Sequence, residues 1–518
     1  MKQYHPILSC AEAQLLEDKI FGGDDAKSAE AMLKVGNKCA DMFFKEFGSR
    51  LPSKVKILVL AGNGHNGGDA IITAGEIAKK CVATICVAAN LSKQMRPNTK
   101  AALHSLTATF GNTRADIIDF EALIRQAEGL EADIIIDGLS GMKFKPPAKP
   151  EFCAVIDAIN KVPALYRISI DIPSGASESH PGNPIFKADV TYATASVKRA
   201  LIEKFNNPHT GRLRYIDIGL FDALPGENSF NNIGDSVISP KFFAMLEKPR
   251  AWQTDKRHYG NLFVIAGSKS FPGAAMLNVR AALRAGTGIV TAFVPETLAP
   301  CFAAIEPSAI WVACPENDSG SISIKGFDIV LKKSARPTAL LMGSGTTASE
   351  DTRAFMAEVL KKYPDTPCVL DADAICPEIA GHACRSKRQI LMTPHEGEIL
   401  RIASDASNAS LRNACAKYSA SIALKSNITR ICDGNSIVYN LSGGPILGRG
   451  GSGDILAGIC GALLSRKDLN LSGKDVLALS SFWLGCAAQA AFDKYGENSV
   501  ATSDIIPFLS LAFKFAKD

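Results

Sequence analysis

The chain lacks any C-x-x-C pair, although it contains 14 cysteines among its 518 residues. These cysteines lie in apolar stretches, as Cys86, Cys368 and Cys460 do, rather than at the spacings of a disulfide framework or a zinc site. Polybasic runs are also missing, because 57 basic and 52 acidic residues give a net charge of only +5. The composition therefore argues against nucleic-acid binding and favours a reduced, cytoplasmic protein.

A signal peptide and a membrane span are not expected either. The first residues pass quickly into the charged stretch 12–18, which leaves no room for the apolar core of a signal peptide. The most membrane-like segment, 476–492, is at the lower length limit of a span and contains two serines and a glutamine. We predict that it is a buried core helix.

Short apolar runs alternate with polar, helix-like stretches in both halves of the chain, which is too long for one ordinary core. In the first half the runs are 55–60, 82–88, 134–137, 168–172 and 190–193. Turn-forming and charged residues crowd positions 220–259, and the runs restart at 262–266, 288–294, 339–342, 367–370 and 390–392. Alternation of this kind predicts mostly parallel sheets with helices on both faces. We predict two α/β domains, 1–225 and 226–518.

A glycine-rich turn follows the first predicted strand. Gly62, Gly64 and Gly67 satisfy G-x-G-x-x-G between strand 55–60 and a predicted helix 70–80, a setting in which backbone can approach a pyrophosphate. A dinucleotide oxidoreductase also needs an acid after the next strand, where this chain has Ala88-Ala89-Asn90. An ordinary hydride-transfer domain is therefore not expected.

The same turn is unusually polar. It carries His65, Asn66 and Asp69, and two further strand ends carry Asp137 and the run Asp171 to Ser174. Ligands collect at the carboxyl ends of strands in open α/β sheets, and oxygen donors of this kind suit an alkali or alkaline-earth cation. The alternative is that these side chains only end strands and cap helices, with Asp69 as an N-cap.

The second half contains a sharper motif, Gly450-Gly451-Ser452-Gly453-Asp454, ahead of the apolar stretch 455–464. Backbone N–H groups at a helix N-terminus form an anion cradle, and glycines let phosphate oxygens approach. Phosphate would repel Asp454 unless the carboxylate faces a substrate hydroxyl whose proton it takes. No G-K-[ST] follows, so this is not a Walker A loop, and the alternative is a glycine C-cap followed by Asp454 as an N-cap.

Through several such stretches the second half resembles the ADP-dependent NAD(P)H-hydrate dehydratases of the ribokinase-like superfamily. The matching stretches are Phe271-Pro272-Gly273-Ala274-Ala275, Ala281-Ala282-Leu283-Arg284-Ala285-Gly286, Met342-Gly343-Ser344-Gly345-Thr346, Thr393-Pro394-His395-Glu396-Gly397-Glu398, Leu424-Lys425 and Gly451-Ser452-Gly453-Asp454-Ile455-Leu456-Ala457-Gly458. The first half resembles the NAD(P)H-hydrate epimerase domain that is commonly fused ahead of it, through residues 66–69, 137–141 and 171–175.

The resemblance implies a Rossmann-like three-layer α/β/α epimerase domain followed by a ribokinase-like α/β domain. It implies repair of NADH or NADPH damaged by hydration of the nicotinamide ring (NADHX and NADPHX). The epimerase interconverts the R and S forms at C6, and the dehydratase uses ADP to expel water from the S form. It also implies potassium in the first domain and Mg²⁺ in the second, and we expect a homo-oligomer with no membrane partner.

Carried over residue by residue, the resemblance implies four groups of site residues. The potassium ligands would be Asn66, Asp137 and Ser174. The hydrated nucleotide in the first half would contact His65, Asn66, Gly67, Gly68, Asp69 and a catalytic Asp171. In the second half it would contact Ala275, Gly345, His395 and the catalytic base Asp454. ADP would be held by Lys425, Ser426, Asn427, Ile428, Thr429, Gly451, Ser452 and Gly453.

The chain departs from the family pattern mainly in its first half. Ala70 replaces a glycine after Asn-Gly-Gly-Asp, and Gly141-Met142-Lys143-Phe144 replaces a Gly-Thr-Gly-Leu turn. In the second half Gly343-Ser344-Gly345 stands for Gly-Pro-Gly. Two other interpretations stay open: a ribokinase-like small-molecule kinase, and a first domain that binds without catalysing.

Overall fold

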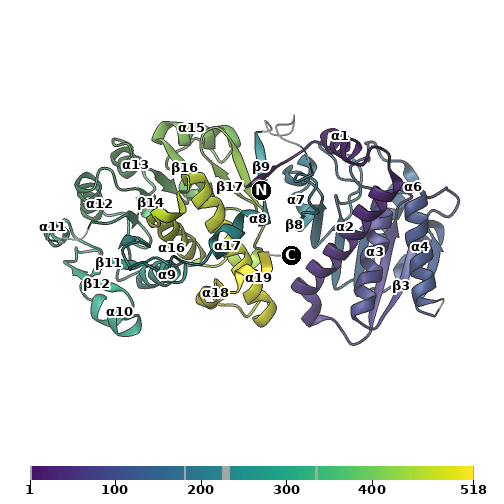
Figure 1. The fold of residues 1–518 in the computed structure, drawn as a ribbon, viewed down its shortest axis with the longest axis horizontal. Coiled ribbons are helices and arrows are strands. Elements are labelled where there is room, and N and C mark those ends of the chain that lie inside the picture. Colours follow the sequence, from purple (N-terminus) through teal and green to yellow (C-terminus); the bar gives the residue numbers. More distant parts are fainter. Residues whose placement is uncertain (1–2, 112, 180–181, 224–233, 333–335, 517–518) are drawn as a thin grey trace. The chain divides into compact units, whose positions relative to one another are not determined.

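The computed structural model describes residues 3–111, 113–179, 182–223, 234–332 and 336–516. The chain forms two compact units, Met1–Ile233 and Gly234–Lys517, which Figure 1 draws in purple to blue and in teal to yellow. The domain boundary predicted between residues 225 and 226 lies outside the described residues.

The first unit is built on a parallel sheet of seven strands. In spatial order these are β4 (Ala115–Asp119), β3 (Ala83–Ala89), β2 (Val55–Ala61), β5 (Ile134–Gly138), β6 (Tyr166–Ile170), β7 (Val190–Thr194) and β8 (Arg212–Ile216). The central strand β5 begins with three buried isoleucines, as expected for a parallel strand that is covered on both faces. The register aligns the ends of the central strands, with Leu60 opposite Asp137 and Asp137 opposite Ser169.

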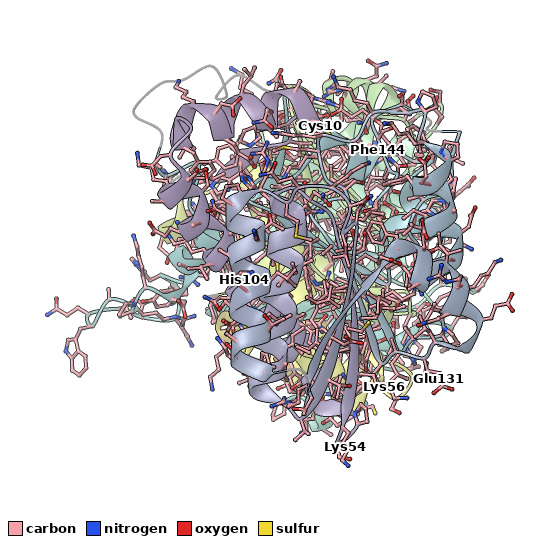
Figure 2. The ribbon with its side chains drawn as sticks, turned by 90° about the vertical axis from the view of Figure 1, so that its right-hand side faces the viewer. Cys10, Lys54, Lys56, His104, Glu131 and Phe144 are labelled. Atoms are coloured by element: carbon pink, nitrogen blue, oxygen red, sulfur yellow. The ribbon has the colours of Figure 1, made fainter. Side chains whose placement is uncertain are left out.

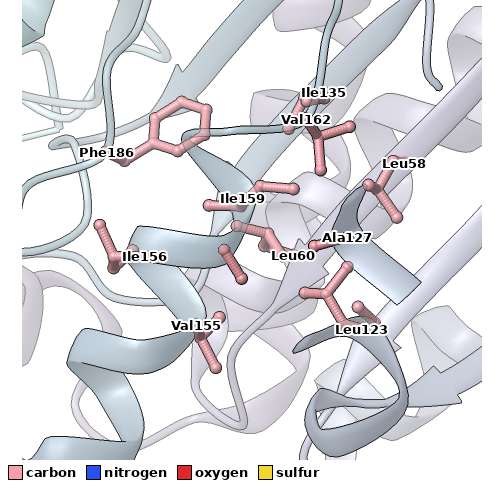
Figure 3. Packing of buried hydrophobic residues seen from close by; sticks show 12 residues of the cluster. Leu58, Leu60, Leu123, Ala127, Ile135, Val155, Ile156, Ile159, Val162 and Phe186 are labelled. Atoms are coloured by element: carbon pink, nitrogen blue, oxygen red, sulfur yellow. The ribbon is translucent and has the colours of Figure 1, made fainter. Parts of the chain in front are cut away.

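Helices cover both faces of this sheet. On one face α2 (Asp25–Phe47), α3 (His65–Lys80) and α4 (Pro97–Phe110) lie side by side (Figure 1). On the other face α5 (Phe120–Gln126) and α6 (Pro150–Ile159) bury leucines and isoleucines against β2 and β5, as Figure 3 shows. The unit also contains β1 (Tyr4–Pro6), α1 (Cys10–Phe21), α7 (Asn207–Thr210) and the short 3-10 helices η1 (Gly48–Arg50), η2 (Ala127–Gly129) and η3 (Arg199–Ile202).

The second unit has a larger, mixed sheet. Its strands follow in spatial order as β9 (Asp235–Ile238), β18 (Ile437–Asn440), β17 (Thr429–Cys432), β16 (Ala420–Leu424), β15 (Ile390–Met392), β14 (Cys368–Leu370), β13 (Ala339–Met342), β10 (Asn261–Ile265), β11 (Ile289–Pro295) and β12 (Ile310–Cys314). From β12 to β16 all pairings are parallel, and β17 is antiparallel to both of its neighbours. The predicted α/β class is thus confirmed in both units.

Three helices of this unit form one continuous packed group: α9 (Pro272–Arg284), α16 (Ser452–Ser465) and α17 (Gly473–Tyr495). Helix α17 contains the apolar stretch 476–492 and is long enough to cross a membrane, but 89% of its most apolar window is buried inside the unit. The prediction of a core helix there is confirmed. The remaining helices are α8 (Pro240–Phe243), α10 (Ala299–Ile305), α11 (Phe327–Leu331), α12 (Glu350–Lys362), α13 (Pro377–Ala383), α14 (Glu396–Ile399), α15 (Asn408–Tyr418), α18 (Thr502–Phe508), α19 (Ala512–Ala516), η4 (Ala244–Glu247), η5 (Ile324–Gly326), η6 (Ala372–Ala374), η7 (Pro445–Leu447) and η8 (Lys467–Leu469).

Helices α9 and α16 approach each other so closely that one position admits only glycine. A Cβ atom on Gly458 would lie 2.4 Å from the carbonyl oxygen of Asn278 and 2.8 Å from the Cβ of Ala281. The Asn278 side chain also donates a hydrogen bond of 2.7 Å to the carbonyl oxygen of Asp454. The glycine therefore fixes where the first turn of α16 stands.

We predict that Gly458→Ala lowers the free energy of unfolding of the second unit by about 1–3 kcal/mol, because the two helix backbones must move apart. Differential scanning calorimetry measures this loss. The matched control is Gly381→Ala in α13, where an added Cβ meets open space in the described part of the chain. That change should be neutral or stabilise by up to ~1 kcal/mol, and an equal loss in both variants would contradict the packing argument.

Candidate functional site

The first candidate site lies at the carboxyl ends of β2, β5 and β6. In Figure 2 this end of the first unit is the one where Cys10 and Phe144 are labelled. The labels Lys54, Lys56 and Glu131 mark the opposite end, where the strands begin. The alignment of the strand ends places the turns after these strands next to one another. The predicted gathering of polar groups at one sheet edge is therefore what the topology produces.

The glycine-rich turn after β2 packs tightly against the protein itself. A Cβ on Gly62 would lie 2.2 Å from the carbonyl oxygen of Leu139, and one on Gly67 would lie 1.9 Å from that of Gly62. Gly64 is the N-cap of α3, which begins at His65 rather than at the predicted residue 70. Asp69 therefore sits within the helix and is not an N-cap, which removes one alternative interpretation of it.

The three predicted potassium ligands come together around Ser140. The side-chain amide of Asn66 donates to the carbonyl oxygen of Ser140 at 2.9 Å, and Ser174 Oγ lies 3.3 Å from the same oxygen. Ser174 donates from its hydroxyl and from its backbone to Asp137, at 2.5 and 2.8 Å. Burial raises the pKa of Asp137 to about 6, and the hydrogen bonds from Ser174 limit the rise.

This cluster has the chemistry of a site for a hard cation. Asn66 Oδ1 and Ser140 Oγ are buried and have no hydrogen-bond partner among the described residues. Within the described ranges, no group of three or more His, Cys, Asp and Glu side chains could hold a metal ion. Amide, hydroxyl and carboxylate oxygens of this kind suit a hard cation.

Two aspartates stand beside this cluster in unequal environments. Asp171 follows β6 with a φ of +69° and forms a buried ion pair with Lys198. Asp69 is buried, and its Oδ1 has no partner in the described part of the chain. Burial, and then the charge of Asp171, raise the pKa of Asp69 well above its ordinary value. The site thus combines one carboxyl group that is paired with an ammonium and one that forms no ion pair in the described part of the chain.

The other predicted contacts of the first site lie on the same turn. His65 is half-buried, and burial followed by the charge of Arg96 lowers its pKa, so its imidazole is neutral at pH 7. Gly68 is buried, and a Cβ there would lie 1.9 Å from the Cε of Met32. Glycine at this position lets α2 pack against the start of α3.

The second candidate site lies at the carboxyl ends of β14, β15 and β16, facing the start of α16. The N-cap of α16 is Gly451, with a φ of +92°, and no described side chain caps the helix. Asp454 stands in the first turn, so it is not the N-cap. The N–H groups of that first turn have no partner within the helix, and apart from that of Ser452, which donates to the carbonyl oxygen of Arg449 at 3.3 Å, they can point at an anion.

The ammonium of Lys425 joins the strand ends to this turn. It lies 3.4 Å from Asp371 Oδ1 and 3.7 Å from Glu398 Oε2, and a Cβ on Gly453 would lie 2.9 Å from it. Asp371 is held in turn by the hydroxyls of Ser344 and Thr393, both at 2.8 Å. Burial by itself lowers the pKa of Lys425, but Asp371 and Glu398 more than reverse this, so the ammonium stays charged.

Asp454 is the carboxyl group of this site that is set to change its protonation near neutral pH. Burial raises its pKa to about 7, Asp371 adds to the rise, and Lys425 opposes it. A general base works best when its pKa lies near the working pH. A carboxyl group with a pKa near 7 and a helix N-terminus that no described side chain caps thus occur in one turn.

The remaining predicted contact residues of the second site differ in their exposure to solvent. Gly345 has a φ of +65° and leaves room for Ala274, whereas Ala275 is wholly buried under Gly267. The ring of His395 is exposed, and its Nδ1 accepts hydrogen bonds from the backbone of Gly397 and Glu398, so it caps α14. Ser426, Asn427 and Ile428 form the turn between β16 and β17, and Thr429 begins β17.

The sequence patterns did not indicate Asp371, Glu398 or Lys198 as site residues. Asp371 directly follows the predicted strand 367–370. Asp171 likewise lies at the end of the predicted strand 168–172, so a comparable signal was present for Asp371. For Lys198 the signal was weaker, since a lone lysine after a strand is usually exposed.

Comparisons with known proteins agree with the division into two units. The family model described as NAD(P)H-hydrate dehydratase matches residues 262–510, and the model described as YjeF-related protein N-terminus matches residues 28–200. A bifunctional NAD(P)H-hydrate repair enzyme of Thermosynechococcus vestitus is 30% identical over 483 residues, which cover 90% of each chain. A relative of the same description from Hyperthermus butylicus is 28% identical over 87% of this chain and 82% of its own.

Among solved structures, a ribokinase-like superfamily protein of Enterococcus faecalis is 20% identical, with a TM-score of 0.47, over 56% of this chain and 99% of its own. The two family models lie one in each structural unit, and the curated relatives match across both. The chain belongs to the family of bifunctional NAD(P)H-hydrate repair enzymes.

Proposed function

We propose that the chain repairs hydrated NADH and NADPH in two steps. The first unit interconverts the R and S epimers at C6 of the hydrated ring, and the second uses ADP to drive loss of water from the S epimer. The observation that carries the proposal is the position of Asp454. It stands in the first turn of α16, whose N-terminus no described side chain caps, and the charge of Lys425 acts on it. The enzyme is proposed to act in the cytoplasm as a homo-oligomer.

The dehydration step needs a better leaving group than hydroxide. Asp454 takes the proton of the C6 hydroxyl, and the C6 oxygen bonds to the terminal phosphorus of ADP while the bond from that phosphorus to the bridging oxygen breaks and AMP leaves. Phosphate then leaves C6 with the electron pair of the C–O bond, and a proton is lost from C5, which restores the C5=C6 double bond of the reduced nicotinamide. Lys425, Ser426, Asn427, Ile428, Thr429, Gly451, Ser452 and Gly453 hold the nucleotide, while Ala275, Gly345 and His395 contact the hydrated substrate. The charged Lys425 and the first N–H groups of α16 offset the charge of the phosphates.

Magnesium is proposed to enter with the nucleotide. Three carboxylates surround the single ammonium of Lys425, so phosphates would meet excess negative charge without a cation. Mg²⁺ is usually bound by one or two carboxylates together with substrate phosphates, rather than by an all-protein cage. The carboxylates of Asp371 and Glu398 fit that mode, and the ion would neutralise phosphate charge.

The epimerisation step is proposed to use Asp171 as the group that moves a proton at the reacting centre. His65, Asn66, Gly67, Gly68 and Asp69 would contact the hydrated nucleotide. Asn66, Asp137 and Ser174 would hold potassium, whose charge offsets the buried carboxyl group of Asp137.

The second candidate function is a small-molecule kinase with a non-catalytic first unit. It is favoured by the same observation, because a base beside a phosphate cradle can also activate a hydroxyl for stable phosphorylation. The two functions differ in product: the kinase leaves a phosphorylated compound, and the repair enzyme regenerates reduced nicotinamide.

Potassium removal tests the first site. Replacing potassium by a bulky organic cation such as tetramethylammonium should slow conversion of the R epimer, because the oxygen donors of Asn66, Asp137 and Ser174 lose their ion. Conversion is followed by chromatography without ADP. Equal rates in the two salts would contradict the assignment of a potassium site in the first unit.

Lys425→Ala tests the nucleotide contact. The variant should weaken ADP binding by about 1–3 kcal/mol, which is the usual contribution of a charge-assisted hydrogen bond to phosphate. Isothermal titration calorimetry measures it. The control is Lys417→Ala, an exposed residue on α15, which should leave ADP affinity unchanged. Equal affinities in the two variants would return Lys425 to a structural role.

Asp454→Asn tests the base. The side chain keeps its size, so ADP should still bind and epimerisation in the other unit should continue, while dehydration falls by about 10²- to 10⁴-fold. Absorbance of regenerated NADH is the readout.

The pH profile provides the control for Asp454. Because the pKa of Asp454 is raised to about 7, wild-type kcat/KM should fall as pH drops below that value and protonates the base. The Asn variant should lose this limb. A variant that keeps more than about a tenth of wild-type activity would contradict the assignment, since that loss is smaller than a base contributes.

A further inference from the structure

Lys198 is a fully buried lysine whose ammonium has two partners. It is 1% exposed, donates a hydrogen bond of 2.7 Å to the carbonyl oxygen of Thr194, and forms an ion pair with Asp171 Oδ1. Taking both charges out of water is costly, and a buried ion pair is often no more stable than apolar side chains of similar size. Fold stability alone therefore does not account for the pair.

The two carboxylate oxygens of Asp171 face different surroundings. Oδ1 faces Lys198 and lies 3.5 Å from the hydroxyl of Thr194. Oδ2 lies 3.3 Å from the backbone nitrogen of Met142 and 2.9 Å from where a Cβ on Gly141 would stand. That same Cβ position is 3.4 Å from Asn66 Cγ, so Oδ2 faces the turn that carries the proposed substrate contacts.

Left-handed backbone at Asp171 and at Ala195 orients the two side chains of the ion pair. Asp171 has a φ of +69°, and its backbone nitrogen donates to the carbonyl oxygen of Tyr192 at 2.8 Å. Ala195, just after β7, has a φ of +64°. Left-handed backbone at a residue other than glycine costs free energy and persists where the surroundings enforce it. The bends after β6 and β7 thus fix the carboxylate and the ammonium against each other.

From this geometry we infer that Lys198 is a positioning residue for epimerisation: its ammonium holds Asp171 in place through Oδ1, while Oδ2, which accepts one long hydrogen bond from the backbone of Met142, faces the substrate and exchanges a proton with it. The inference rests on the function proposed for the first unit. Asp69 provides the internal comparison, because it is buried at the same site without an ammonium partner, and its pKa is well above the ordinary value.

An anionic Asp171 suits a balanced reaction. The C6 hydroxyl of the hydrated ring is on a carbon bonded to the ring nitrogen. Oδ2 takes the hydroxyl proton while the C6–N bond breaks, its electron pair passes to nitrogen, and C6–O becomes a carbonyl. The nitrogen then attacks the opposite face of that carbonyl, and Oδ2 returns the proton to oxygen. Atoms and charges are the same before and after, so no co-reactant is needed.

The first test compares full-length variants in conversion of the R to the S epimer without ADP. Lys198→Met should lower kcat by at least about 100-fold, in the range of a lost general base, while KM changes by less than about threefold. Lys198→Arg keeps the charge and should recover at least a tenth of wild-type kcat. Gly141→Ala leaves the ion pair intact but crowds Oδ2, and should lower kcat at least tenfold.

The matched control breaks another buried ion pair of the same unit. Arg214 of β8 pairs with Glu46 of α2, and both are buried. Arg214→Met should lower the unfolding temperature as Lys198→Met does, yet keep kcat per folded molecule. Lys198→Met/Asp171→Asn removes both charges of the active pair, and should recover the unfolding temperature without recovering kcat.

The second test follows oxygen. In ¹⁸O-labelled water the wild-type product should retain the original C6 oxygen, and uptake of label at the rate of epimerisation would overturn the base role of Asp171. The role of Lys198 would be overturned if Lys198→Met kept more than a tenth of wild-type kcat. An equal loss of kcat in Arg214→Met would overturn it as well. A wild type with no conversion above the spontaneous rate would instead refute the proposed function of the first unit.

Discussion

A lysine ammonium paired with a buried aspartate that directly follows a parallel strand organises each of the two sites. Lys198 pairs with Asp171 after β6, and Lys425 lies beside Asp371 after β14. Parallel strands end at one edge of a sheet, so the residues after them are brought together whatever their distance in sequence. In both units the lysine comes from a later strand end than the aspartate, and the pair therefore links separate loops of one site.

The pairing divides the carboxyl groups of each site into two kinds. Asp171 and Asp371 form ion pairs with lysines, whereas Asp69 and Asp454 form none among the described residues, and burial raises the pKa values of these two. A neutral carboxyl group can give a proton and an anionic one can take it, which is what reactions at a ring hydroxyl need. In the second site Asp454 stands in the first turn of α16, whose N-terminus has no side-chain cap among the described residues, and a helix N-terminus of this kind suits an anion such as phosphate. Positions that admit only glycine, such as Gly67 and Gly458, keep these backbones close enough for the arrangement.

Much of the fold follows from local sequence, because strands buried on both faces are continuous apolar runs. The predicted strands 339–342 and 390–392 coincide with β13 and β15, whereas β4 and β8, which carry polar residues on an edge of the sheet, were not predicted. Asn66, Asp137 and Ser174 were predicted to lie together and do so around Ser140. The partnership of Lys198 with Asp171 was not predictable, since it depends on the pairing of β6 with β7 and on left-handed backbone at Asp171. The role of each site residue stays a prediction.

In the proposed function one chain joins epimerisation to ADP-driven dehydration. The most direct test gives the purified protein an unseparated mixture of R and S hydrated NADH and follows the absorbance of reduced nicotinamide. Without ADP the absorbance should stay flat; with ADP it should rise past the amount of S epimer initially present, toward the whole mixture, faster than spontaneous epimerisation allows. A rise that stops at the initial S fraction would contradict epimerisation by the first unit, and the appearance of a stable phosphorylated product without NADH would contradict the repair activity itself.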